Sequence, residues 1–141
     1  MASVEFTVPF AHGLQRARTG NGRFYDTTRN KMDKLEIQAA FKSALVCQKR
    51  RFFAAKGTPV RLKIEVYTPL AQSAHKDTAS MPHVKKPDLD NVVKLVLDAL
   101  NGVAWDDDQQ VNCIFAKKLD RTCRREQFTR IYLATDEVER S

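Results

Sequence analysis

The sequence lacks the features of membrane-spanning, exported and disulfide-bonded proteins. No apolar run approaches the ~18 residues that are typical of a membrane span. The N-terminus shows no basic stretch followed by an apolar one, as a signal peptide would. The 3 cysteines form no C-x-x-C pair, and they do not combine with the 3 histidines at the spacing of a zinc site. We therefore expect a cytoplasmic protein with reduced thiols and no membrane partner.

The composition is that of one basic globular domain. With 141 residues, 43% of them hydrophobic, and no internal repeat, the chain can bury one core, so we expect a single domain over residues 1–141. It carries 24 Lys+Arg against 17 Asp+Glu, a formal net charge of +7. This charge favours a polyanionic partner, and nucleic acid is the first candidate.

One acidic segment runs against this overall charge. Residues 88–108 contain a single base, Lys94, and six aspartates: Asp88, Asp90, Asp98, Asp106, Asp107 and Asp108. Two carboxylates about 4 Å apart repel by roughly 4 kcal/mol at an effective dielectric near 20, so a converging group needs a cation. Mg²⁺ prefers carboxylate oxygens and keeps water and phosphate as its other ligands. A metal site within a phosphate-binding surface is typical of a nuclease.

The local pattern predicts a helix between the two acidic groups. Asp88 follows Pro87 and is placed to cap the helix, and Asn101-Gly102 ends it. The apolar face consists of Leu89, Val92, Val93, Val96, Leu97 and Leu100. Asp88 and Asp90 can share one metal only if Asp88 still belongs to the extended segment and Asp90 to the first turn, because successive helical residues diverge by about 100°.

The second acidic group, Asp106 to Asp108, follows this helix and precedes a predicted strand. We expect that strand to return beside the helix start and bring the two groups together. In an alternative interpretation, Asp88 is only a helix cap, Asp106–Asp108 is a solvated turn and Lys94 is a surface lysine. The single tryptophan, Trp105, is expected in the core, where it would fix the direction of the acidic turn.

The other elements predict an α+β domain, a mixed β-sheet with two main helices. The predicted strands are 4–10, 60–67, 111–116 and 127–133, and the first helix runs from Thr27 or Thr28 to about Ala54. The expected buried face of that helix consists of Leu35, Ala39 or Ala40, Phe41, Ala44 and Leu45. Lys49-Arg50-Arg51 would lie in its last turns, where cations favour the helix dipole.

Three basic segments are candidates for DNA contact, with plain solvation as the alternative. Residues 12–23 form a Gly-bearing, Arg-rich loop that we expect to be flexible. Residues 69–87 form a long loop expected to be mobile and to order on DNA, with Lys85 and Lys86 near the scissile phosphate. The last two strands would form a hairpin whose basic tip holds Lys117, Lys118, Arg121, Arg124 and Arg125.

Three short motifs occur in order along the acidic segment. They are D-L-D-N-x-x-K from Asp88 to Lys94, L-D-A-L-N-G from Leu97 to Gly102, and D-D-x-Q-V from Asp107 to Val111. Together they resemble the RusA family of Holliday junction resolvases, small endonucleases of phages, prophages and bacteria. Chain length and element order also resemble the family, so the resemblance spans most of the chain.

The resemblance implies catalytic roles for Asp88, Asp90, Lys94 and Asp108. The three aspartates would hold Mg²⁺, or Mn²⁺ in its place, and Asp107 would support them without binding the metal. The implied activity is resolution of four-way DNA junctions by paired symmetric nicks, in DNA recombination and repair, by a homodimer. One departure concerns the aromatic residues that some members place before D-L-D to wedge the junction open, because Lys85-Lys86-Pro87 stands there in this chain.

Other functions remain compatible with these residues. A Mg²⁺ nuclease acting on flaps or single strands would use the same chemistry on another substrate. A non-catalytic DNA-binding accessory of recombination would use the aspartates as caps and turns only. An interaction module would use its basic charge for solubility alone and would show no salt-dependent DNA binding.

Overall fold

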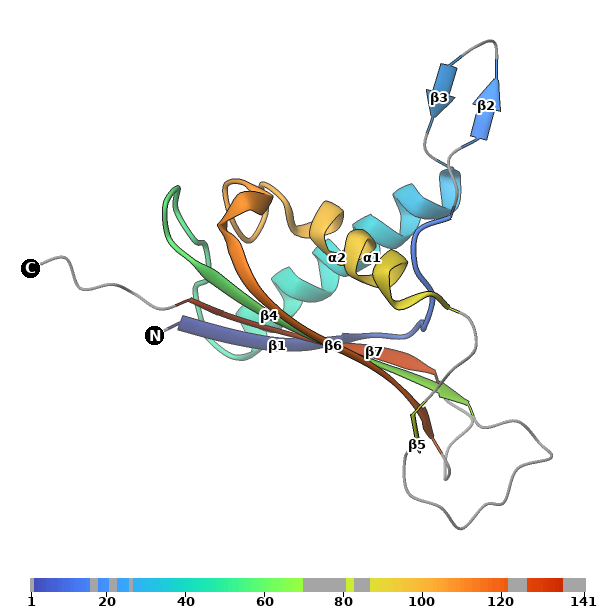
Figure 1. Ribbon diagram of the computed structural model, residues 1–141. Helices are drawn as coiled ribbons and strands as arrows, with labels where there is room; N and C mark the ends of the chain where they lie inside the picture. The colour runs from blue at the N-terminus through green and yellow to red at the C-terminus, as the bar shows by residue number, and fades with distance from the viewer. Residues whose placement is uncertain are drawn as a thin grey trace, which may run out of the picture.

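Two helices lie against one face of a five-stranded sheet (Figure 1). The computed structural model describes residues 2–15, 18–20, 23–25, 27–69, 81–82, 87–121 and 127–135. The elements are β1 (Ala2–Val8), β2 (Arg18–Gly20), β3 (Arg23–Tyr25), α1 (Thr28–Cys47), β4 (Val60–Pro69), β5 (Met81–Pro82), α2 (Leu89–Leu100), the short 3₁₀ helix η1 (Asp108–Gln110), β6 (Val111–Arg121) and β7 (Phe128–Thr135). The predicted α+β class, with a mixed sheet and two main helices, is confirmed. Among the described residues, neither helix combines the length and apolar character that crossing a bilayer requires.

The sheet order is β1-β7-β4-β6-β5, with β4 at the centre of the three long inner strands. β4 pairs in parallel with β6 and antiparallel with β7, which makes the sheet mixed. The inward side chains of β4, those of Val60, Leu62, Ile64 and Val66, are all buried. Alternation of buried and exposed positions is the pattern of a strand with helices on one face and solvent on the other.

The predicted hairpin between the last two strands is wrong. β6 and β7 do not pair, because β4 lies between them and pairs with both. Lys117, Lys118 and Arg121 therefore belong to the body of β6, not to a hairpin tip. Arg124 and Arg125 lie outside the described residues.

Helix α1 begins as predicted but ends about seven residues earlier than expected. Thr27 is its N-cap, and the Thr27 hydroxyl accepts a hydrogen bond from the Asn30 amide at 3.1 Å. After the C-cap Gln48, Lys49 adopts a left-handed conformation with φ of 52°. The Lys49 amide then bonds to the Val46 carbonyl and the Arg50 amide to the Leu45 carbonyl, which is the Schellman pattern of a helix end.

This early end changes the role of the basic residues that follow. The Arg50 guanidinium donates to the Ser3 carbonyl at 2.9 Å, and the Gln48 side-chain Nε2 donates to the Glu5 carbonyl at 2.8 Å, so both side chains tie the end of α1 to β1. Lys49-Arg50-Arg51 thus lies beyond the helix and not in its last turns. On the helix itself, Phe41 is buried as predicted. Leu35 was expected to be buried but is 58% exposed, and Ile37 is buried in its place.

Helix α2 forms between the predicted cap and stop. Asp88 is its N-cap, Asn101 its C-cap, and Gly102 has the left-handed φ of 76° that glycine adopts at little cost. Its core side chains are Val92, Leu95, Val96, Ala99 and Leu100. Predicted face residues Leu89, Val93 and Leu97 are partly buried against the same core.

The β4-α2-β6 unit decides where the acidic residues lie. Because β4 and β6 are parallel, the helix that connects them must run back across the sheet before β6 can start. The 12 residues of α2 cover about 18 Å at 1.5 Å per residue. Residues just before α2 and residues just before β6 are therefore found at opposite ends of the helix, as Figure 1 shows.

Candidate active site

The start of α2 presents two carboxylates and a lysine to solvent. Asp88 has extended backbone angles, φ −71° and ψ 127°, while Asp90 belongs to the first helical turn. This is the backbone arrangement that sharing one metal requires. Within residues 87–121, the Asp88 carboxylate makes no capping hydrogen bond to the turn that follows, which argues against a purely capping role. Lys94 Nζ lies 3.9 Å from Asp90 Oδ2, and these side chains are 62% and 71% exposed.

A cleft of about 340 Å³ adjoins Asp88. Its lining includes His12, Gly13, Arg29, Pro87, Asp88 and Asn91. Gly13 lies so close to α2 that a Cβ atom there would come within 2.5 Å of the Asn91 carbonyl carbon and the Val92 nitrogen. Any side chain at position 13 would push this wall away from the helix start.

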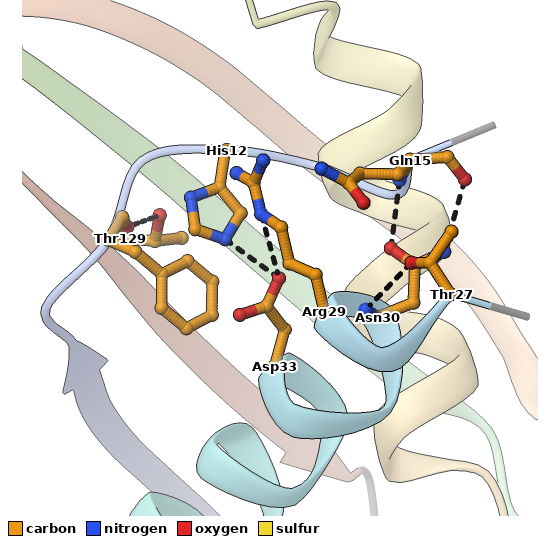
Figure 2. A network of polar contacts seen from close by, with 8 residues as sticks. His12, Gln15, Thr27, Arg29, Asn30, Asp33 and Thr129 are labelled. Carbon is orange, nitrogen blue, oxygen red and sulfur yellow. Dashed lines mark hydrogen bonds and ion pairs between the residues drawn. The ribbon is translucent and has the colours of Figure 1, made fainter.

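The wall that carries His12 and Gly13 is held at several points. Thr129 donates to the Phe10 carbonyl at 2.7 Å, and the Leu14 amide donates to the Asn91 carbonyl at 3.1 Å. The Gln15 amide donates to the Asn30 side chain at 2.8 Å, as Figure 2 shows. Residues 12–15 are thus fixed to the helices, and residues 18–20 and 23–25 pair as a short hairpin, where the sequence predicted one flexible loop.

At the other end of α2, the acidic turn is fixed by buried groups. Trp105 is fully buried, as predicted, and its indole Nε1 donates to Asp108 Oδ1 at 2.8 Å. Trp105 was predicted to fix the direction of the acidic turn, and this hydrogen bond shows that its contact is with the Asp108 carboxylate. Asp106, by contrast, is exposed.

Gln110 anchors the same turn to the loop after α1. Its Oε1 accepts hydrogen bonds from the Asp106 and Asp107 amides, at 2.9 and 2.8 Å. Its Nε2 donates to the carbonyls of Ala54, Ala55 and Thr58, at 3.1, 2.7 and 3.0 Å. A buried amide with donors and acceptors both satisfied is a rigid connection. Gln110 is the glutamine of the D-D-x-Q-V motif. The motif therefore contained this anchoring residue, although the sequence alone did not predict its role.

The two acidic groups do not converge within one chain. The described residues contain no group of three His, Cys, Asp or Glu side chains placed to hold a metal ion. The expectation that the next strand returns the second group to the helix start was wrong, because β6 begins at the far end of α2. What β6 brings back is Lys118, whose Nζ donates to the Pro87 carbonyl at 2.8 Å, beside Asp88.

The predicted DNA-binding residues fall into separate places. Lys118 reaches the helix start, whereas Lys117 Nζ lies 3.4 Å from Glu65 Oε2. Arg121 is the last residue of β6, and its side chain is outside the described set. Lys85, Lys86 and most of the predicted 69–87 loop also lie outside the described residues, apart from β5, which pairs with β6.

Glu65 organises the cations of the open sheet face. Burial by itself would raise its pKa, but hydrogen bonds from Tyr67 and Lys117 and the positive charges of Lys63 and Lys117 outweigh burial and hold the pKa below its ordinary value. Arg130 lies over the stacked rings of Tyr67 and Phe128, 5.7 and 5.8 Å from their centroids. Glu65 is itself buried among these neighbours.

Comparison with known proteins shows the family of the chain. Residues 7–130 match the endodeoxyribonuclease RusA family, which covers most of the chain. The chain is also 32% identical over 124 residues to the uncharacterized protein YqaN of Bacillus subtilis strain 168, covering 79% of this chain and 83% of that protein. The chain therefore belongs to the RusA family of endodeoxyribonucleases, the DNA-binding nucleases that resolve Holliday junctions in recombination.

Proposed function

We propose that this chain is a Mg²⁺-dependent Holliday junction resolvase whose metal ligands are Asp88, Asp90 and Asp108. The observation that carries the proposal is the geometry at the start of α2. Asp88 has an extended backbone and makes no side-chain capping hydrogen bond within residues 87–121, Asp90 follows in the first helical turn, and a cleft adjoins Asp88. Carboxylates with room for water and phosphate are the ligands that Mg²⁺ favours, and Mn²⁺ accepts the same set.

The chain's own residues divide the work around the phosphate. A bound divalent ion would activate a water molecule and stabilise negative charge on the phosphate oxygens. Lys94 is held one turn from Asp90 and adds a positive charge that can contact the phosphate as its charge grows. Lys118 fixes the Pro87 carbonyl and so the position of Asp88. Asp107 supports the acidic turn beside Asp108.

A second copy of the chain supplies the missing carboxylate. Asp108 follows the end of α2, about 18 Å of helix away from Asp88 and Asp90, so the three cannot hold one ion within one chain. In a two-fold homodimer, the partner subunit's Asp108 can complete the site at each helix start. Two sites related by two-fold symmetry suit two symmetric cuts in a four-way junction.

DNA contact is proposed for the basic residues around this end of the molecule. Lys118 and Arg121 lie on the part of β6 that approaches the helix start, and Lys117 lies on the open face of the sheet. Lys85 and Lys86 directly precede Pro87 in the sequence. The net charge of +7 supports binding to a phosphate backbone with strong salt dependence.

The test is cleavage of a synthetic four-way junction, a flap and a plain duplex of equal length, with Mg²⁺ or with EDTA. We expect paired symmetric nicks in the junction alone, abolished by EDTA and reduced by roughly 10²–10³-fold or more in Asp90→Asn. Asp98→Asn, which neutralises an aspartate about two turns along the same helix stripe, is the matched control and should cut normally. Cleavage of the flap alone would change the substrate, and junction binding without cleavage would support an accessory protein instead.

A further inference from the structure

The cleft wall opposite α2 contains a polar trio that the proposed metal site does not use. His12 Nε2 lies 2.7 Å from Asp33 Oδ2, and Arg29 Nε lies 3.8 Å from the same oxygen (Figure 2). The Asp33 side chain is only 10% exposed. A buried carboxylate needs such partners, so Asp33 fixes the position of both side chains.

The trio holds more donors than Asp33 can use. A guanidinium has five N–H donors, and the one that faces Asp33 is on Nε. Figure 2 shows the terminal nitrogens of Arg29 directed away from Asp33, beside the His12 ring. Arg29 is 45% exposed and lines the cleft together with His12 and Asp88. The terminal nitrogens of a guanidinium match phosphate oxygens in a two-pronged geometry.

The trio also sits on a rigid support. The His12 ring stacks on Phe10, with centroids 4.4 Å apart, and Phe10 is buried. The segment is hydrogen-bonded to β7, α1 and α2 through Phe10, Gln15 and Leu14. A cleft wall held this firmly loses little conformational entropy when a ligand binds against it.

We propose that Arg29, oriented by the buried Asp33 and flanked by the His12 ring, forms a phosphate clamp in the cleft. The clamp binds one phosphodiester of the cleaved DNA strand. This phosphodiester neighbours the one that is cut at Asp88 and Asp90. This inference rests on the proposed function, because it takes the cleft as the path of the cleaved strand. It assigns substrate positioning, not chemistry, to Arg29.

The test measures binding to a synthetic four-way junction in EDTA, where no strand is cut. Arg29→Gln is compared with Lys31→Gln, which removes one positive charge from an exposed position of the same helix, two residues on. We expect Arg29→Gln to weaken binding roughly tenfold, and to lower the slope of log affinity against log salt by about 0.9. Lys31→Gln should change both quantities much less. Equal effects of the two substitutions would overturn the clamp.

A second arm locates the phosphate. Junctions carrying one uncharged methylphosphonate at successive positions near the branch point are bound by wild type and Arg29→Gln. The clamp predicts one position at which the neutral linkage weakens junction binding by the wild-type protein roughly tenfold and leaves binding by Arg29→Gln unchanged. If every neutral linkage weakens both proteins equally, Arg29 contacts no particular phosphate and the proposal is wrong.

Folding and function are separated from the clamp by two controls. Thermal unfolding should show Arg29→Gln within about 2 °C of wild type, since its ion pair is long and half-exposed. If it is less stable than that, Arg29→Lys, which keeps the charge without the planar fork, must still lose the position-specific effect. Cleavage by the wild-type protein with Mg²⁺ tests the proposed function separately. If the wild type cuts the junction and Arg29→Gln binds it as tightly as the wild type, only the clamp is overturned. If the wild type does not bind the junction, both proposals are overturned.

Discussion

The start of α2 and the turn beyond its end both carry catalytic candidates, but the chain holds them in different ways. At the start, Asp90 and Lys94 are largely exposed, and the contact between them is a 3.9 Å ion pair. Beyond the end, Asp108 accepts a hydrogen bond from buried Trp105, and Gln110 joins five backbone groups of two segments. Function at the helix start should therefore be separable from stability, whereas at the far end the two should change together.

Lys94→Gln gives the largest expected effect, on activity at the helix start. We expect junction cleavage to fall by roughly 10²–10³-fold, because the proposed role of Lys94 is to stabilise charge on the phosphate. Stability should change by less than about 0.5 kcal/mol, since the Lys94–Asp90 pair is exposed. Single-turnover cleavage and urea unfolding measure the two quantities. A loss of stability large enough to explain the loss of activity would remove the difference between the two ends.

Gln110→Ala is the matching change at the far end. It leaves three carbonyls and two amides without the buried side chain that serves them, so we expect a loss of about 3 kcal/mol of unfolding free energy. Cleavage should fall as well, because the acidic turn loses its anchor. Neighbouring Gln109→Ala is the control for side-chain truncation at an exposed position. Unchanged stability in Gln110→Ala would show that the turn holds itself.

Trp105→Phe makes a finer change in the same place. The substitution keeps an aromatic ring in the core but removes the N–H that bonds to Asp108. We expect about 2 kcal/mol of destabilisation and roughly tenfold slower cleavage with unchanged junction binding. Full cleavage by a protein of reduced stability would mean that Asp108 needs no orientation from Trp105.

Glu65→Gln tests a region outside both ends and should have the smallest effect. The pKa of Glu65 is lower in the folded protein than its ordinary value of 4.5. The Glu65 charge therefore stabilises the fold at any pH above 4.5, and this stabilisation is lost as the pH falls through the lower pKa of the folded state. Wild type should exceed Glu65→Gln by less than about 1 kcal/mol at pH 7, and the gap should close in acid. Thermal unfolding from pH 7 to pH 3 measures the gap. A constant gap would assign the effect to packing, and altered cleavage would place this face in the site.

Local patterns predicted α2 well and α1 less well, for a physical reason. Asp88 and Asn101-Gly102 are strong local signals for the limits of a helix, and the structure uses both. The end of α1 depends on a left-handed conformation at Lys49. A glycine at this position would have predicted such a helix end, whereas a lysine does not. Tertiary bonds from Gln48 and Arg50 to β1 stabilise that end, and no local pattern encodes them.

The candidate site was predictable in its residues but not in its arrangement. The spacing of Asp88, Asp90 and Lys94 predicted their neighbourhood, and Trp105 was expected beside the acidic turn. The parallel pairing of β4 and β6 is a long-range choice, and it alone places Asp108 at the far end of α2. The contributions of His12, Arg29 and Asp33 depend on a loop packing against two helices, which leaves no periodic signal in the sequence.

The central claim, a site completed across two chains, is tested most directly by mixing two inactive variants. Asp90→Asn and Asp108→Asn, each inactive alone, are unfolded and refolded together so that subunits exchange. In a mixed dimer, one site combines both substitutions and the other combines the intact Asp90 of one chain with the partner subunit's Asp108. We predict that single nicks reappear at up to about a quarter of the wild-type rate, since half of the dimers are mixed and half of their sites are intact. A mixture as inactive as its components, with subunit exchange confirmed by differently tagged chains, would contradict the account.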